Sequence, residues 1–375
     1  MLWAAIVLGV VAGAAYVLFF YDNGFSGFHR TEVTPREAEE SQDGSLRTVY
    51  FEAVDGTRIE GWLFQPKTAP APLVIMAPGL TGTKEGHLEP FARRFVREGF
   101  AVLAIDFRCF GGSDGEPRHW VDPFRQVQDY GAAIRFAVDV LASDGSVDAS
   151  RIALWGSSFS GGSAIVAAAE SPRIAALVAQ CPFLDTPKEL EPSFSEMVRY
   201  VPWTMLDLAR SWLQERSGVR LAPVYIPAFG RPGEFAFAKS RENPSRLDPS
   251  RPGARFWQTL PRSLRGGWEN KLLARFLADF DEFKPKTSIA SVKCPIYLVA
   301  AERDDMIPSR FVREAADLVS HDQCDVTLHD CGHFDLYVDP VLGKNADLQA
   351  EFLARHIGLG FTDPAAGRAD QADVA

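Results

Sequence analysis

Cysteine is scarce in this sequence of 375 residues, and its scarcity argues against two kinds of covalent or metal-based stabilisation. Five cysteines occur, an odd number, and no two of them form a Cys-x-x-Cys pair. Such spacing is not typical of a disulfide framework, so we interpret the thiols as buried or loop residues. No histidines and cysteines cluster at the spacing of metal ligands, so no metal site is predicted. The five positions are Cys109, Cys181, Cys294, Cys324 and Cys331.

Positive charge is also in short supply. Lysine and arginine together number 39 against 49 aspartates and glutamates, which gives a net charge of -10. A nucleic-acid partner requires a basic face, so this balance argues against one. The proportions of charged (23%) and hydrophobic (46%) residues are those of a globular protein that can bury a large core.

The first 21 residues contain no charged side chain. About 20 apolar residues in a helix match the roughly 30 Å thickness of the hydrocarbon core of a bilayer. A secretory signal peptide usually has a shorter apolar part preceded by Lys or Arg, and only Met1 precedes it here. We therefore predict a single transmembrane anchor at residues 1–21, with a cleaved signal and a secreted protein as the alternative. The acidic stretch 22–44 is interpreted as a linker.

Apolar runs and helix-like segments alternate through the first half of the chain. Two strand-like runs flank Asp55-Gly56, which is a strong hairpin signal. Short continuous apolar strands separated by helices are typical of a parallel sheet with both faces covered. The predicted strands comprise residues 47–51, 58–64, 73–76, 101–105, 151–155 and 174–179, and the predicted helices comprise residues 91–98, 123–141 and 161–170.

The alternation stops after Phe183. The segment 184–290 is rich in proline, arginine and aromatic residues, and one helix is predicted within it at 195–216. We interpret this segment as a cap inserted into a continuing sheet. Two further strands and a closing helix follow it, at residues 295–300, 325–329 and 348–357.

This pattern predicts one α/β core in two parts. The sheet is expected to be mostly parallel, with helices on both of its faces. A disordered tail is expected at the end. In chain order, the anchor, the linker, the first part of the core, the cap, the second part of the core and the tail comprise residues 1–21, 22–44, 45–183, 184–290, 291–359 and 360–375.

Ser158 stands where a predicted strand turns directly into a predicted helix. A serine exposed on such a sharp turn requires small residues two positions before and two positions after it, because the strained backbone crowds them. Gly156 and Ser160 meet this requirement, whereas Ser157 has the bulky Trp155 two positions earlier. The pattern is Gly-x-Ser-x-Ser, a mild departure from Gly-x-Ser-x-Gly. We predict that Ser158 is a catalytic nucleophile.

An acid and a base are expected to follow the nucleophile in that order. Asp304 and Asp305 lie in a loop directly after the strand at 295–300, at the carboxyl edge of the sheet, where such sites gather. Among the seven histidines, only His333 follows the last predicted strand on a short glycine-containing loop. His333 is expected to accept the serine proton, and the aspartate to hold its tautomer and to stabilise the imidazolium.

Backbone donors are needed for the negative charge that develops on an attacked carbonyl oxygen. We expect them from Phe159, directly after the nucleophile, and from Leu80, in a glycine-rich turn after the strand at 73–76. A phosphate cradle is the other use of such a turn, but its GxxxxGK[ST] sequence is absent. Lys84 either orients this loop or is a plain surface lysine.

These motifs resemble those of the α/β-hydrolase superfamily over residues 46–357. The stretch 106–117 resembles the superfamily's D-x-R-G-x-G-x-S-x-G loop, with Cys109 in place of a glycine. The loop after residue 300 resembles the pattern Gly-x-x-Asp-x-x-Val-Pro, which favours Asp304 over Asp305. The resemblance therefore implies an α/β-hydrolase fold.

The surroundings of Ser158 and His333 resemble a capped subgroup of this superfamily. The subgroup is similar to polyketide-transferase-like, Xaa-Pro-peptidase-like and serine-aminopeptidase-like hydrolases, and residues 227–235 of the cap resemble it as well. We carry no peptidase activity over from these labels. The resemblance implies a triad of Ser158, Asp304 and His333 and no cofactor.

The expected activity is that of a serine hydrolase acting through an acyl-enzyme. Aromatic residues in the cap predict a hydrophobic small-molecule substrate with an ester, thioester or related acyl bond. Acyl transfer and carbon–carbon bond hydrolysis are alternatives that use the same triad. A binding module without catalytic activity is the alternative from a different class.

Overall fold

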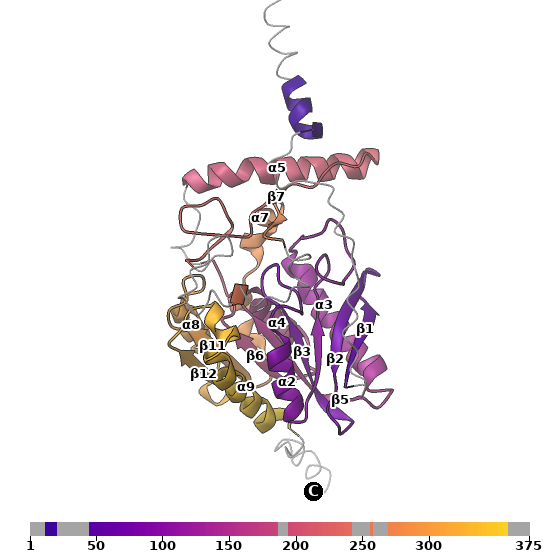
Figure 1. Cartoon of the computed structure of the whole chain (residues 1–375), viewed down its shortest axis with the longest axis vertical. Helices are drawn as coiled ribbons and strands as arrows, with labels where there is room; N and C mark the ends of the chain where they lie inside the picture. The colour runs from indigo at the N-terminus through magenta and orange to yellow at the C-terminus, as the bar shows by residue number, and fades with distance from the viewer. Residues whose placement is uncertain (1–11, 21–44, 187–193, 242–255, 258–268, 359–375) are drawn as a thin grey trace, which may run out of the picture.

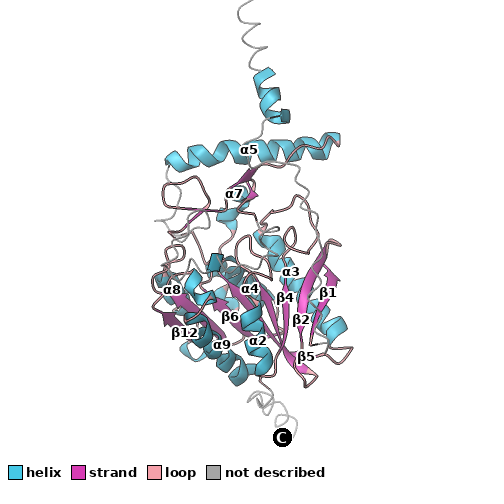
Figure 2. Cartoon of the chain, viewed as in Figure 1, coloured by secondary structure: helices cyan, strands magenta, loops and turns pink. Residues whose placement is uncertain are grey.

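An eight-stranded sheet forms the centre of the computed structural model, which describes residues 12–20, 45–186, 194–241, 256–257 and 269–358 (Figures 1 and 2). The strand order is β1-β2-β4-β3-β5-β6-β11-β12. β2 runs antiparallel to β1 and β4, and the other neighbouring strands are parallel, so the predicted mostly parallel sheet is confirmed. The strands are β1 (Leu46–Glu52), β2 (Arg58–Phe64), β3 (Ala71–Ala77), β4 (Ala101–Ile105), β5 (Val147–Ser157), β6 (Ile174–Gln180), β11 (Ile296–Ala301) and β12 (Cys324–His329).

Helices cover both faces of this sheet. α2 and α9 pack together on one face, and α3, α4 and α8 lie on the other. α3 begins directly after Asp122, whose carboxylate accepts the Arg125 N–H and so caps the helix. These helices are α2 (Glu89–Arg97), α3 (Pro123–Phe136, continued by the π-helical turn η1, Ala137–Leu141), α4 (Phe159–Glu170), α8 (Ser309–Ala316) and α9 (Val341–Ile357).

The burial of the strands explains why the sequence pattern predicted them. Every residue of β3 is buried, because the strand has helices on both sides. Leu73 and Ile75 face the α3 and α4 layer, whereas Val74 and Met76 face the α2 and α9 layer. Such two-sided burial produces the continuous apolar runs that predicted the strands.

The segment between β6 and β11 forms a separate small assembly. Its long helix α5 (Phe194–Ser217) lies beyond one end of the sheet, away from α9 (Figure 1). Its described strands pair among themselves, β7 with β10 and β8 with β9, and none of them joins the eight-stranded sheet. The remaining elements are β7 (Tyr225–Ile226), β8 (Phe229–Gly230), β9 (Ala238–Lys239), β10 (Leu272–Leu273), α7 (Phe276–Asp279), η3 (Phe280–Glu282), η4 (Pro285–Thr287) and η5 (Ile289–Ser291).

The predicted transmembrane helix gains no support from the described residues. Residues 12–20 form a helix, but no helix in the described part of the chain is long and apolar enough to cross a membrane. Most of the predicted anchor, all of the predicted linker and all of the predicted tail lie outside the described residues. The anchor therefore stays a prediction.

Two helical glycines differ sharply in the space around them. A Cβ on Gly131 in α3 would contact only the Arg135 guanidinium, at 3.6 Å. A Cβ on Gly162 in α4 would lie 2.4 Å from the Phe183 carbonyl oxygen, which is backbone and cannot move away cheaply. We expect Gly131→Ala to raise the free energy of unfolding by about 0.5–1 kcal/mol, because alanine loses less conformational freedom on folding.

The matched substitution Gly162→Ala should lower the same free energy, since overpacking typically costs about 1–3 kcal/mol. Urea titration of both variants beside the parent protein measures the two effects. Equal destabilisation by the two substitutions would contradict this interpretation of the two sites.

Candidate active site

Ser158 lies at the turn between β5 and α4 with φ 58° and ψ -122°. This left-handed backbone is unusual for a residue that carries a Cβ, and it is typical of strained functional turns. A Cβ on Gly156 would lie 2.2 Å from the Ser160 carbonyl oxygen, which explains the glycine there. Ser160 fits at the other crowded position because its hydroxyl donates to the Ala77 carbonyl and accepts the Ser157 N–H, each at 2.8 Å.

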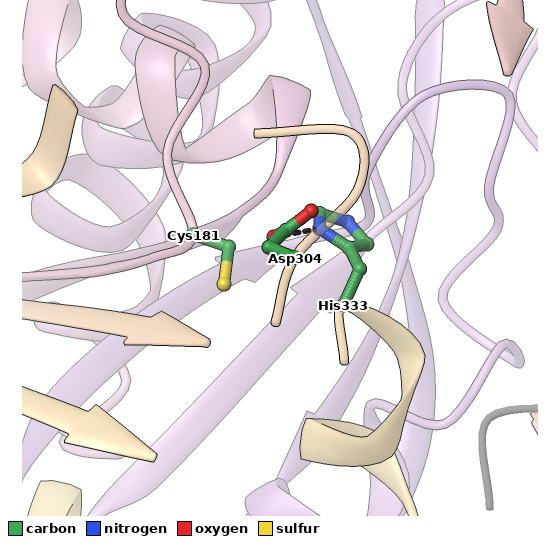
Figure 3. Close-up of side chains that lie close together, drawn as sticks. All are labelled: Cys181, Asp304 and His333. Carbon is green, nitrogen blue, oxygen red and sulfur yellow. Dashed lines mark hydrogen bonds and ion pairs between the residues drawn. The ribbon is translucent and has the colours of Figure 1, made fainter. Parts of the chain in front are cut away.

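His333 and Asp304 form a buried hydrogen-bonded pair, with 2.6 Å between His333 Nδ1 and Asp304 Oδ2 (Figure 3). The other carboxylate oxygen, Oδ1, accepts the backbone N–H groups of Met306 and Ile307, each at 2.8 Å. These bonds fix the carboxylate in place. A carboxylate at Nδ1 favours the tautomer with the proton on that nitrogen, which leaves Nε2 able to accept a proton.

The neighbouring acid, Asp305, has a different set of partners. Its Oδ1 accepts the Ser240 hydroxyl at 2.9 Å, and its Oδ2 accepts the Arg241 N–H at 2.8 Å. Asp305 therefore contacts the segment between β6 and β11, while Asp304 contacts His333. The resemblance-based preference for Asp304 agrees with this geometry.

Cys181 is the third polar neighbour of this pair, and Figure 3 shows Asp304 between the thiol and His333. One donor atom from each of the three residues lies within 4.8 Å of the others, a spacing that also suits a metal ion. Ligands around zinc at bond lengths of about 2.0–2.3 Å stand more than about 3 Å apart. The 2.6 Å contact between Asp304 and His333 is too short for that, so it fits a shared proton instead. Burial raises the pKa of Cys181 well above its usual value, which keeps the thiol protonated.

Ser158 and His333 line one pocket with a cavity of about 60 Å³. Its walls are mainly apolar, and they come both from the sheet core and from the segment between β6 and β11. Phe256 and Trp257 belong to the segment between β6 and β11, and their ring centroids each lie 4.9 Å from that of Phe334, which follows His333. The other lining residues are Pro78, Gly79, Leu80, Gly82, Thr83, Gly86, Leu88, Phe229, Met306 and Tyr337.

The two expected oxyanion donors lie on either side of the serine. Phe159 is the first residue of α4 and follows Ser158 directly. Leu80 lines the pocket, and the loop that carries it passes against the serine, since a Cβ on Gly79 would lie 3.2 Å from Ser158 Cβ. The backbone of both residues is therefore near the hydroxyl.

Comparison with known proteins places the fold in a family. Residues 74–342 match the model of the alpha/beta hydrolase family. The chain belongs to the alpha/beta hydrolase family. It is 31% identical over 311 residues to the quorum-quenching protein AidA of Acinetobacter baumannii (strain MDR-ZJ06), covering 82% of this chain and 94% of AidA.

Two further proteins are similar to this alpha/beta hydrolase. The polyketide transferase af380 of Aspergillus fumigatus is 39% identical over 134 residues, which is 36% of this chain and 44% of that protein. The crystal structure of the alpha/beta hydrolase GrgF from Penicillium sp. sh18 superposes with a TM-score of 0.66 at 24% identity. It covers 83% of this chain and 99% of GrgF, and at that identity it shows the fold alone.

A buried lysine holds the loop of Leu80 in this alpha/beta hydrolase. Lys84 Nζ lies 2.5 Å from both Glu60 Oε1 and Asp106 Oδ2, and all three side chains are buried. The Lys84 N–H also donates to Asp106 Oδ1 at 2.6 Å. Burial favours the neutral amine, but the carboxylates of Asp106 and Glu60 outweigh it and raise the pKa of Lys84. Of the two interpretations of Lys84, the surface lysine is wrong and the loop-orienting one agrees with the structure.

Sequence reasoning missed Tyr337, which lines the pocket and donates a hydrogen bond to the Ser157 hydroxyl. That hydroxyl also accepts the side-chain amide of Gln180 at 3.0 Å, and the Gln180 carbonyl oxygen accepts Asn345 and Gln349. The network joins residues that are up to 194 positions apart, counting the bond from Trp155 to Gln349. The signal in the sequence that could have indicated this contact is the pair of aromatic residues, Phe334 and Tyr337, that follows His333.

We expect Lys84→Met to lower the free energy of unfolding by about 3–5 kcal/mol, because it leaves two buried carboxylates without their cation. Lys286→Met is the matched control, since Lys286 pairs with Glu314 at the exposed surface and should cost no more than about 1 kcal/mol. Urea unfolding followed by circular dichroism measures both. A small effect at Lys84 would contradict the structural role assigned to this ion pair.

The loop histidine His87 should make stability depend on pH. Burial lowers the pKa of His87, whose Nε2–H donates to the Phe256 carbonyl at 2.8 Å. The unfolded chain then binds the proton more readily, so His87 lowers stability as the pH falls below about 6.5. His87→Gln keeps a donor without a titrating ring and should lose less stability than the parent between about pH 7.5 and 5.5. Urea titrations at the two pH values measure the free energy of unfolding of parent and variant. Identical losses of that free energy would refute the role given to His87.

Proposed function

We propose that this alpha/beta hydrolase is a serine hydrolase that cleaves an ester, thioester or related acyl bond of a hydrophobic small molecule. The carrying observation is the pocket shared by Ser158, on its left-handed turn, and His333, hydrogen-bonded to Asp304. A nucleophile, a base and an orienting acid are the three roles that acyl transfer to serine needs. Membership of the family and the similarity to a polyketide transferase support acyl chemistry.

In this mechanism Ser158 Oγ attacks the acyl carbon while His333 Nε2 takes the hydroxyl proton. The carbonyl electron pair moves onto oxygen, where the N–H groups of Leu80 and Phe159 are proposed to stabilise it. The tetrahedral intermediate then collapses, and the departing alcohol or thiol takes the proton from His333. A water molecule, deprotonated by His333, attacks the acyl-enzyme, and Ser158 regains its proton as the acid leaves.

The substrate class follows from the pocket. Its walls carry the aromatic rings of Phe229, Phe256, Trp257 and Phe334, so an apolar acyl group suits it. The segment between β6 and β11 supplies three of these rings, and we propose that it acts as the cap. A cavity of about 60 Å³ holds an acyl group only a few atoms long without rearrangement of the walls.

Acyl transfer to an acceptor other than water is the second candidate. The apolar walls around Ser158 give water little to bind, which favours an organic acceptor at the acyl-enzyme stage. The similarity to a polyketide transferase is consistent with it. Product analysis with and without added alcohols separates transfer from hydrolysis.

We also keep the membrane anchor as a proposal. Its support is the charge-free sequence of residues 1–21 and the exposure of Tyr16, Phe19 and Phe20 on the helix at 12–20. An apolar substrate that partitions into lipid would be available to an enzyme that is anchored to the membrane.

We expect Ser158→Ala to abolish labelling by a fluorophosphonate probe and to lower the rate of nitrophenyl ester hydrolysis at least about 10⁴-fold. Asp304→Asn should lower the hydrolysis rate by about 10³- to 10⁴-fold, because the amide favours the wrong histidine tautomer. Asp305→Asn is the matched control and should stay near the parent rate, since Asp305 does not contact His333.

Folding of each variant is checked by circular dichroism. Parent protein that is folded but neither labels nor hydrolyses any ester would refute the catalytic proposal and favour a binding module. Equal losses for the two aspartate variants would refute the role given to Asp304.

A further inference from the structure

The outer face of α5 is an apolar stripe. Five of its large side chains are exposed, and at about 100° per residue they lie within roughly 100° of arc on one side of the helix. We call this set the α5 stripe. It consists of Met197, Val198, Val201, Met205 and Trp212, each of them about half exposed (47–56%).

The opposite face of α5 is firmly bound to the rest of the protein. Thr204 donates to the Ala274 carbonyl at 3.1 Å. The buried Asp207 accepts the Val224 N–H at 2.8 Å and pairs with Arg275 at 2.6 Å. Turning the helix to bury the stripe would break these buried polar contacts, so the stripe stays outside.

The helix at residues 12–20 contacts α5 through Arg210, which lies on a different flank of α5 from the stripe. Arg210 of α5 donates to the carbonyls of Val17 and Leu18 at 3.0 and 2.8 Å, near the end of that helix where carbonyls lack helical partners. Figure 1 shows the helix rising from α5 on the side away from the sheet. Tyr16, Phe19 and Phe20 on it are exposed.

Exposed apolar surface is concentrated at this end of the molecule. Of the sixteen large apolar side chains that are exposed among the described residues, nine belong to α5 or to the helix at 12–20. Exposed apolar surface concentrated at one end of a molecule is typical of an interaction site. A protein partner flat against α5 would have to accommodate the helix that rises from it, whereas a bilayer accepts a helix that enters and another that lies along its surface.

The charges near the stripe also suit a lipid surface. The Arg216 guanidinium borders the stripe and lies 4.8 Å from the ring centroid of Trp212. Tryptophan favours the headgroup level of a bilayer, and arginine binds lipid phosphates there.

We propose that α5 is an interfacial helix that docks the protein on a lipid bilayer, with the α5 stripe in the headgroup and acyl boundary and the helix at 12–20 directed into the hydrocarbon. The inference goes beyond the proposed hydrolase activity and uses the proposed anchor only for the direction of the adjoining helix. A docked α5 places the segment between β6 and β11, and with it the pocket side of the enzyme, toward the membrane.

The test uses the full chain with single reporter positions. Val201→Cys in the stripe and Val54→Cys, which lies in the β1–β2 turn and is 77% exposed, are each labelled with an environment-sensitive nitrobenzoxadiazole fluorophore. Parent protein treated identically gives the background from the native thiols, which are buried except for the partly exposed Cys324. The samples are mixed with phosphatidylcholine vesicles, with and without phosphatidylglycerol, and with lipids that carry brominated acyl chains.

We expect fluorescence at position 201 to rise severalfold with vesicles and to be quenched by the brominated lipids, while position 54 responds to neither. Adding Met205→Glu to the Val201→Cys variant should remove the response, because a carboxylate in the stripe opposes insertion. Hydrolysis of a soluble nitrophenyl ester, measured on every sample, separates failure of docking from failure of the catalytic proposal.

Three outcomes would overturn the proposal. Protein that floats with vesicles while position 201 stays unquenched would show that α5 is held away from the bilayer. Protein that does not float with either vesicle composition would exclude docking altogether. A response at position 201 that depends on protein concentration in the absence of lipid would assign the stripe to a second copy of the chain.

Discussion

The ion pairs of Lys84 with Glu60 and Asp106 constrain three segments that are distant in sequence. Glu60 belongs to β2, Asp106 follows β4, and Lys84 belongs to the loop after β3. A charged amine with almost no exposure needs both carboxylates, so none of the three segments can shift alone without leaving a charge unpaired. Glycines at 111 and 112 allow the close approach, because a Cβ there would lie about 2 Å from these carboxylates. The loop that carries Leu80 is thereby held against Ser158.

A second buried polar group, next to Ser158 in the chain, holds the turn that follows His333 in place. Tyr337, in the 3-10 turn η7 (Phe334–Tyr337), contacts the Ser157 hydroxyl, and Gln180 links the same hydroxyl to α9. The serine turn and the turn after His333 are thus joined through one residue. A network in which each member is bonded specifies one arrangement, since a single missing partner would leave a buried polar group unsatisfied. Ion pairs on one side of Ser158 and neutral hydrogen bonds on the other therefore position the site.

The sequence predicted those parts of the structure that follow from local periodicity. The strands of the core were predicted because burial on both faces makes them continuously apolar, and Ser158 stood out because a crowded turn restricts its neighbours. α8 was missed, since only Val312 and Ala315 of its eight residues are buried and the apolar signal is weak. The burial of Lys84 and the contacts of Tyr337 depend on residues brought together by the fold. Local sequence patterns do not predict contacts of this kind. Even the choice between Asp304 and Asp305 depended on the resemblance to a family.

Those two adjacent aspartates divide between two parts of the molecule. One carboxylate is bonded to His333, and the next one along the chain is bonded to Ser240 and Arg241 of the segment between β6 and β11. Only one peptide unit separates the two attachments, and that unit is stiff. A displacement of the segment at Ser240 would therefore act directly beside Asp304, the partner of His333. Under the proposed mechanism, a substrate that displaces this segment would affect proton transfer at His333 as well as its own binding, so substrate selectivity and turnover would be coupled.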